Sequence, residues 1–146
     1  MENRMMDPVI PVEKMEAGYE LPWLMKFITF EKMVRFSEDL GKSQHTDVEF
    51  SKQYGRPTAI AQGLMSHLYL TEVLTRAFGR KWLEGGKLTS NFIQSVFIGD
   101  TLYVKAKVRG KKVEDGGTRL ELETWCENQR GQVVTAGMAS LLVDKK

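Results

Sequence analysis

The second half of the chain alternates between apolar and polar side chains, and this pattern limits the possible folds more than any other feature. In residues 101–109, and again in residues 119–127, every second side chain is suited to a protein core. These positions are Leu102, Val104, Ala106 and Val108, then Leu120, Leu122, Thr124 and Cys126. Because successive side chains of a strand point to opposite faces, the alternation predicts two strands, each buried on one face.

Turn-forming residues separate these strands from their neighbours. Gly99 and Asp100 precede the first strand, and residues 115–117 and 128–131 contain the glycine, asparagine and aspartate that tight turns favour. The run 132–143 is apolar on both faces, which indicates a strand in the middle of a sheet or at an interface. Since the period of two begins near Lys87, the sequence predicts an antiparallel meander of about four strands.

A long helix is predicted before these strands, over residues 57–79. Its apolar side chains lie on several faces, and Glu72 and Arg76 are its only formal charges. A helix that is apolar nearly all round is typical of a buried helix. The shorter elements predicted upstream are a strand over 21–28, a helix over 30–39 capped by Thr29, and a helix that starts at Thr46, with Glu49 in capping-box spacing, and stops at Gly55.

Together these elements predict an α+β fold. A single antiparallel sheet of this size has one face to cover, and one long helix lying across it does so. The 146 residues fit one domain. Residues 1–18 are interpreted as a lead-in segment, because Pro8 and Pro11 disfavour a regular helix there.

Charge and cysteine content narrow the function classes. With 21 basic and 19 acidic residues the net charge is +2, so we expect neither nucleic acid nor a membrane as a partner. No apolar run approaches the ~20 residues that span a bilayer. Residues 1–14 carry charges and prolines rather than the apolar core of a secretory signal, so a cytoplasmic protein is expected.

The single cysteine, Cys126, excludes an internal disulfide and a cysteine-cluster metal site, and we expect it to be a small apolar strand residue.

Two short segments carry the residues with useful chemistry. Residues 36–47 read Phe-Ser-Glu-Asp-Leu-Gly-Lys-Ser-Gln-His-Thr-Asp, and residues 61–65 read Ala-Gln-Gly-Leu-Met. In this order and spacing they resemble the MaoC-like or (R)-specific enoyl-CoA hydratase family, whose motif places an aspartate and a histidine on a loop, then a short helix, then an alanine-x-glycine segment at the central helix. The Gly-Gly pair at 85–86 and the Phe-Ile-Gly-Asp-Thr-Leu segment at 97–102 extend the resemblance to residues 30–143.

The resemblance implies the hot-dog fold, in which an antiparallel sheet wraps a long central helix, and the reversible hydration of a trans-2-enoyl thioester. It also implies that His45 is the catalytic base, Asp39 its partner, and the Gly63 N–H a donor to the thioester oxygen. Histidine suits the work, because its unperturbed pKa of about 6.5 lets it accept and return a proton near neutrality. The loop departs from the family pattern: Asp39 and His45 are six positions apart rather than five, Glu38 replaces a glycine, and an asparagine-proline pair is absent.

The candidate residues also have plainer interpretations. His45 could be a solvated loop residue, and Asp39 an exposed acid near a helix end. Asp47 is expected to cap the second short helix. His67 is expected to be a hydrogen-bonded core residue or to line the acyl tunnel. With two histidines at this spacing, a zinc site is not expected.

Gly63 also has a physical rationale. A glycine at the start of a helix leaves its N–H open to a ligand, and helix N-termini favour negative charge. When water adds across an enoyl thioester, the carbonyl oxygen gains enolate character, and an N–H aimed at it stabilises the developing charge. The alternative is a glycine needed only for close packing of the helix against the sheet.

The implied reaction needs no metal or redox cofactor, and coenzyme A or acyl carrier protein enters only as part of the acyl-thioester substrate. A homodimer or larger homo-oligomer, or a pair with a related hot-dog subunit, is expected because unpaired sheet edges are normally covered. Two other functions stay open. One is a hot-dog thioesterase that uses Glu38 or Asp39 over the thioester carbonyl. The other is a non-catalytic acyl-thioester-binding subunit of a heteromeric hydratase.

Overall fold

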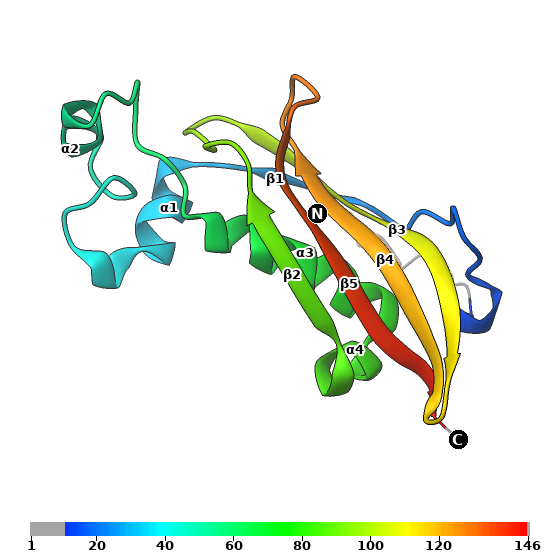
Figure 1. Ribbon diagram of the computed structural model, residues 1–146. Coiled ribbons are helices and arrows are strands. Elements are labelled where there is room, and N and C mark those ends of the chain that lie inside the picture. The colour runs from blue at the N-terminus through cyan, green and yellow to red at the C-terminus, as the bar shows by residue number, and fades with distance from the viewer. Residues whose placement is uncertain (1–10, 146) are drawn as a thin grey trace, which may run out of the picture.

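Five strands form one antiparallel sheet in the part of the chain that the structure describes. The computed structural model describes residues 11–145, without the side chains of Asp39, Asp144 and Lys145, so residues 1–10 of the predicted lead-in lie outside it. The strands are β1 (Leu24–Phe27), β2 (Lys87–Phe92), β3 (Thr101–Glu114), β4 (Gly117–Glu127) and β5 (Val133–Lys145). They lie in the order β1-β3-β4-β5-β2, and Figure 1 shows them as one twisted layer.

The alternation predicted for β3 and β4 is confirmed. Side chains at every second position of both strands are buried and form the core under the sheet. All eight positions predicted to face inward are buried: Leu102, Val104, Ala106, Val108, Leu120, Leu122, Thr124 and Cys126. The doubly apolar run at the end of the chain is also explained, because β5 lies in the sheet interior between β4 and β2.

The order of the strands corrects the predicted meander. Strands β3, β4 and β5 follow one another, but β2 pairs with β5 and not with β3. The segment after β2 does not turn back into a hairpin, because other backbone groups bind it: Ala61 N–H donates to the Val96 carbonyl, and Ile60 pairs with Phe97. The chain therefore crosses to the other side of the sheet before β3 begins.

The long helix α3 (Gly63–Phe78) lies across one face of the sheet, as predicted (Figure 1). Its buried residues are Met65, Ser66, Leu70, Val73, Leu74 and Phe78. Two predictions about it were wrong. The helix begins at Gly63 rather than at residue 57, because residues 60 and 61 are held in extended backbone pairing. It is also not buried on all sides, since Leu64 and Leu68 are 48% and 45% exposed.

Three shorter α-helices accompany α3 (Figure 1). Helices α1 (Phe30–Phe36) and α2 (Val48–Gln53) lie beyond the start of α3, and α4 (Arg80–Gly85) follows directly after its end. Thr29 caps α1 as predicted, since its Oγ1 accepts from Lys32 N–H at 3.2 Å. The cap of α2 is Asp47, whose Oδ1 accepts from Phe50 N–H at 2.8 Å, and not Thr46. The Thr46 hydroxyl is used inside the preceding loop, where it accepts from the Ser43 N–H at 2.9 Å.

The short 3-10 helices η1 (Val12–Lys14) and η2 (Glu38–Leu40) are the remaining elements in residues 11–145. None of the helices in this part of the chain combines the length and the apolar character that crossing a membrane requires.

Candidate active site

His45 lies in the loop between η2 and α2, and a backbone carbonyl sets the orientation of its ring. Nδ1 of the ring is 2.8 Å from the Ile60 carbonyl oxygen. Because a carbonyl only accepts, Nδ1 carries the hydrogen, and Nε2 of the neutral ring keeps its lone pair. The loop is tied to itself as well, since Ser43 Oγ accepts from the His45 N–H at 3.2 Å and Thr46 Oγ1 donates to the Gly41 carbonyl. The ring is thereby prepared to accept a proton at Nε2.

The Ile60 carbonyl is available to His45 only because the chain is extended there. In a helix that began at residue 57, this carbonyl would accept from the Leu64 N–H instead. The observed Ile60 N–H donates to the Gln44 carbonyl at 3.0 Å, and the Ala61 N–H donates to the Val96 carbonyl at 2.8 Å. Residues 60 and 61 therefore lie between the His45 loop and the segment that follows β2.

His45 and Gly63 line the same cavity, which has a volume of about 250 Å³. Gly63 is the first residue of α3, and in the described part of the chain no group accepts a hydrogen bond from its N–H. An unsatisfied N–H at a helix start can bind an oxygen that carries developing negative charge. The structure thus brings two of the three predicted site residues to one cavity.

The contact between Gly63 and Phe92 supports a packing role for this glycine as well. A Cβ on Gly63 would lie 2.7 Å from Cγ and Cδ2 of the Phe92 ring, which is closer than unstrained contact allows. Phe92 ends β2, lines the same cavity and is 57% exposed. The absence of a side chain at Gly63 therefore allows the ring to lie against the start of α3.

Two buried hydroxyl groups fix the first turn of α3. Ser66 Oγ donates to the Gly63 carbonyl at 2.8 Å and lies 2.7 Å from Thr135 Oγ1. Because the Ser66 proton is used on the carbonyl, Thr135 is the donor in the hydroxyl pair. Both residues are buried and line the cavity, so they form a polar wall between α3 and β5.

The other candidate residues are placed differently. Asp39 lies in η2, and its side chain is outside the described residues. Glu38 is exposed, and Asp47 caps α2 as expected. His67 is half-buried and bonds to β2, with Nδ1 2.9 Å from Ser90 Oγ, and it is not among the residues that line the cavity.

Cys126 is buried between β4 and α3, where its Sγ lies 3.8 Å from the Ser66 carbonyl oxygen. Burial raises the pKa of this thiol to about 12, so it stays protonated at neutral pH. A protonated, enclosed thiol is a poor nucleophile. This agrees with its expected role as a small apolar strand residue.

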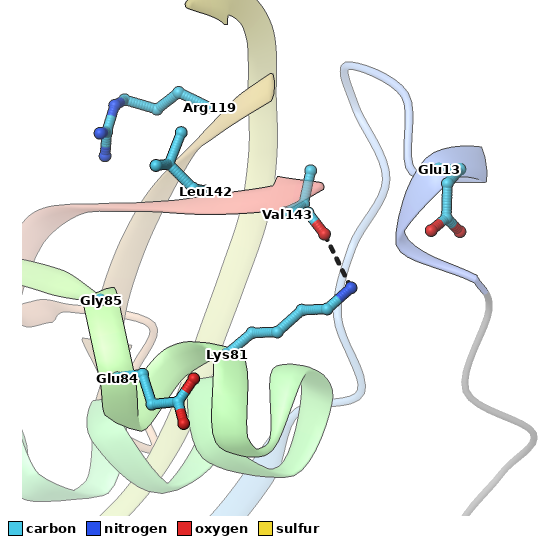
Figure 2. A pocket seen from close by; sticks show the side chains of 7 residues that line it. All are labelled: Glu13, Lys81, Glu84, Gly85, Arg119, Leu142 and Val143. Carbon is cyan, nitrogen blue, oxygen red and sulfur yellow. Dashed lines mark hydrogen bonds between the residues drawn. The ribbon is translucent and has the colours of Figure 1, made fainter. Parts of the chain in front are cut away.

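A larger cavity, about 480 Å³, lies at the other end of the sheet beside α4. Its cations have protein partners: Lys81 Nζ donates to the Val143 carbonyl at 2.7 Å, and Arg119 Nε to Glu114 Oε1 at 2.7 Å (Figure 2 shows the first). No histidine is among the described residues that line this cavity. Despite its larger volume it lacks a group suited to proton transfer near neutral pH, so the chemistry favours the His45 cavity. In the described part of the chain, no three histidine, cysteine or carboxylate groups lie close enough to hold a metal ion.

Sequence reasoning missed Ser66, Thr135 and Phe92. The first two look like ordinary helix and strand residues, and Thr135 belongs to an apolar strand far from the motif segments. Only the pairing of β5 with β2 and the packing of α3 bring them to His45. Phe92 ends a strand whose pairing partner the sequence did not identify.

Comparison with known proteins shows the family and the fold of the chain. The family model described as "MaoC like domain" matches residues 28–127, and the search of curated proteins finds no match. Among solved structures, the unliganded R-hydratase PhaJ1 from Pseudomonas aeruginosa is 21% identical, with 94% of this chain and 87% of that chain covered and a TM-score of 0.76. The (R)-hydratase from A. caviae involved in PHA biosynthesis is 17% identical, with 91% and 100% covered and a TM-score of 0.74.

A third similar structure is the C-terminally truncated HadBC (3R-hydroxyacyl-ACP dehydratase) complex from Mycobacterium tuberculosis. It is 15% identical, with 89% of this chain and 98% of that chain covered and a TM-score of 0.70. At these identities the three structures share the fold with this chain. The family match, in contrast, spans most of the sequence and includes both the His45 loop and Gly63. The chain therefore belongs to the family of MaoC-like dehydratase domains, and its fold is the hot-dog fold.

Proposed function

We propose that this chain is a hydro-lyase that reversibly hydrates a trans-2-enoyl thioester to a 3-hydroxyacyl thioester. One observation carries the proposal: a histidine with a free Nε2 lone pair and the first N–H of a helix line one cavity. The first group suits proton transfer, and the second suits an oxygen that gains charge. The similar structures that are hydratases or dehydratases support this reaction class.

In the proposed hydration, His45 Nε2 takes a proton from water while the water oxygen bonds to the β-carbon. Electrons of the double bond move toward the thioester carbonyl, and the Gly63 N–H stabilises the enolate oxygen. His45 then returns this proton to the α-carbon, so the product gains one hydroxyl and one hydrogen. These steps need only acid–base groups and an oxyanion donor, and coenzyme A or acyl carrier protein is carried by the substrate.

Asp39 is proposed to hold the water rather than to orient the histidine, since the Ile60 carbonyl already occupies Nδ1. On this basis Asp39→Asn should lower kcat by roughly 10-fold or more, because a charged acceptor for the water is lost. Steady-state hydration rates measure the effect. Activity within a few-fold of the unaltered protein would remove Asp39 from the mechanism, and Glu38 would then be the next acid to replace.

The reaction itself is tested with a panel of trans-2-enoyl-CoA thioesters of different chain length. We expect the enoyl absorbance to fall and a single 3-hydroxyacyl enantiomer to accumulate, without release of free thiol. Thiol release with no hydroxyacyl product would replace this proposal by the thioesterase. Absence of turnover that a related hot-dog chain restores would instead support a non-catalytic subunit, an arrangement in keeping with the HadBC complex.

A second copy of the chain is the proposed partner of the β2 edge. In the described sheet β2 pairs on one side only, with β5. Four exposed apolar side chains lie on β2, the residue after it and the neighbouring face of α3: Leu64, Leu68, Phe92 and Ile93. An unpaired strand beside apolar side chains is normally covered, and an antiparallel pair of identical strands is self-complementary.

We therefore expect the protein to be at least a dimer at micromolar concentration, as measured by light scattering. Leu68→Glu should shift the population to monomer, because it places a charge in the apolar contact. Leu83→Glu on α4, where the side chain is 69% exposed, is the matched control and should leave the mass unchanged. An unaltered protein that scatters as a monomer would contradict the prediction.

A further inference from the structure

Arg56 links the two sides of the His45 cavity. It follows Gly55 at the end of α2, and its side chain donates two hydrogen bonds to different segments of the chain. Nε donates to Gln44 Oε1 at 2.5 Å, and Nη1 donates to Ser95 Oγ at 3.2 Å. Gln44 directly precedes His45, and Ser95 lines the cavity.

Arg56 joins the segment with Gln44 to the segment with Ser95, and no backbone hydrogen bond described above links these two segments directly. Each is bonded instead to the segment between them, Gln44 through the Ile60 N–H and Val96 through the Ala61 N–H. Three short segments thus lie side by side, with residues 60 and 61 in the middle. Arg56 bridges the outer two, so it fixes the distance between them. His45 and the Ile60 carbonyl that accepts from it lie within these three segments.

The partners of Arg56 indicate that this bridge has a geometric role. Both are neutral, and in the described part of the chain Arg56 forms no ion pair with a carboxylate. A guanidinium is planar and donates in fixed directions, so two bonds from one group define the distance between their acceptors. A hydrogen bond from a charged donor is also roughly twice as strong as a neutral one.

We propose that Arg56 is a positioning residue, which holds the Gln44–His45 peptide in register with the Ile60 carbonyl and with the Ser95 wall of the cavity. The inference rests on the proposed role of His45 as the base, but the effect of Arg56 on the position of the His45 ring can be measured without the reaction. Without the bridge, two hydrogen bonds with Ile60 join the His45 loop to the 60–61 segment: the Ile60 N–H donates to the Gln44 carbonyl, and His45 Nδ1 donates to the Ile60 carbonyl. The ring can then leave the carbonyl that fixes its tautomer.

The test uses the full chain with Arg56→Lys and Arg56→Met. Lysine keeps the charge but cannot reach both acceptors with a fixed fork. Both variants should lower kcat for enoyl-CoA hydration by roughly 10-fold or more, since a displacement of about 1 Å at a reacting group can cost about 10²-fold. KM should stay within about two-fold, because a positioning residue does not bind substrate.

A second measurement is independent of activity. In a protein labelled with ¹⁵N-histidine, the Nδ1–H signal of His45 should weaken or shift toward the solvent-exposed position in both variants. The His67 signals should not move, because its partner Ser90 is on β2. If the unaltered protein hydrates none of the enoyl-CoA thioesters, the proposed function is wrong. The His45 signal still tests whether Arg56 positions the ring, because it does not depend on turnover.

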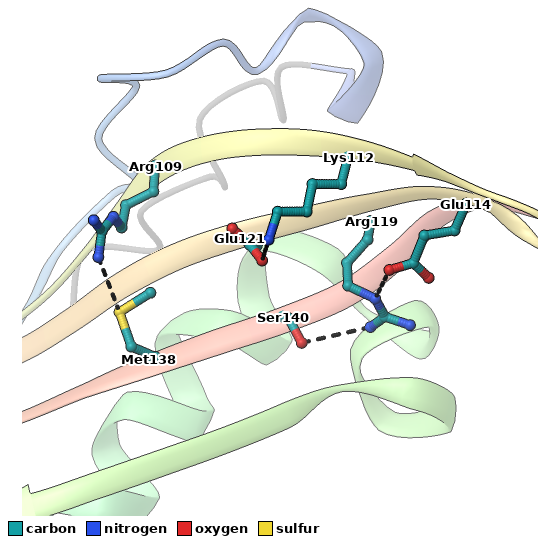
Figure 3. Close-up of polar contacts among 7 residues, drawn as sticks. All are labelled: Arg109, Lys112, Glu114, Arg119, Glu121, Met138 and Ser140. Atoms are coloured by element: carbon teal, nitrogen blue, oxygen red, sulfur yellow. Dashed lines mark hydrogen bonds and ion pairs between the residues drawn. The ribbon is translucent and has the colours of Figure 1, made fainter.

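Arg119→Lys is the matched control. Arg119 also bridges two partners, Glu114 and Ser140, but on the outer face of the sheet (Figure 3). It should leave both kcat and the His45 signal unchanged. An unchanged His45 signal in the Arg56 variants would overturn the inference. A rise in KM at constant kcat would also overturn it, because Arg56 would then contact the substrate.

Discussion

Replacement of His45 by alanine should lower kcat for hydration of an enoyl-CoA by roughly 10²-fold or more, the usual contribution of a positioned acid–base group. The Ile60 carbonyl holds Nδ1–H, so Nε2 is the ring atom that can take a proton from water. Alanine offers no such atom. Loss of the enoyl absorbance in steady state measures the change, and KM should change much less than kcat.

The other histidine provides the control for this experiment. His67→Ala removes a half-buried ring that bonds to Ser90 and does not line the cavity. It should keep kcat within a few-fold. Both variants should remain folded by circular dichroism, because neither ring is part of the buried apolar core. Equal losses in the two variants would indicate a shared structural effect and would remove His45 from the proposed mechanism.

Gly63→Val should also lower kcat by about 10²-fold, the scale for loss of one donor to an oxyanion. The branched side chain lies at the first residue of α3, where the thioester carbonyl is proposed to approach the N–H. It also meets the Phe92 ring, which a Cβ would approach to 2.7 Å. That ring is 57% exposed in the single chain and is not part of its buried core, so we expect the thermal stability of the protomer fold to change little.

A smaller change separates the two roles of Gly63. Gly63→Ala adds only the Cβ, and Phe92→Ala removes the ring that it meets. If room for the thioester is what matters, the double variant should stay as inactive as Gly63→Ala. Recovery of activity in the double variant would assign the glycine to packing against Phe92. Gly85→Ala in α4, where a Cβ meets nothing within 4 Å, should leave activity and melting temperature unchanged.

The sequence by itself determined the parts of the fold that depend on neighbouring residues. Alternation over 101–109 and 119–127 predicted which faces of β3 and β4 are buried, since the period of a strand is set by its backbone. Thr29 marked the start of α1, because its hydroxyl bonds to an N–H three residues away. The loop with His45 and the glycine at α3 were found through their order and spacing in the family motif.

The tertiary structure decided what depends on pairing between distant segments. Local pattern predicted that β2 would continue into a meander and that the long helix would start at residue 57. Both predictions were wrong for one reason. Backbone groups of residues 60 and 61 bind those of Gln44 and Val96, and backbone groups are the same in every residue, so their partners leave no mark in the sequence. That pairing keeps Ile60 out of the helix and frees its carbonyl for His45. It also makes Gly63, rather than residue 57, the helix start with an open N–H.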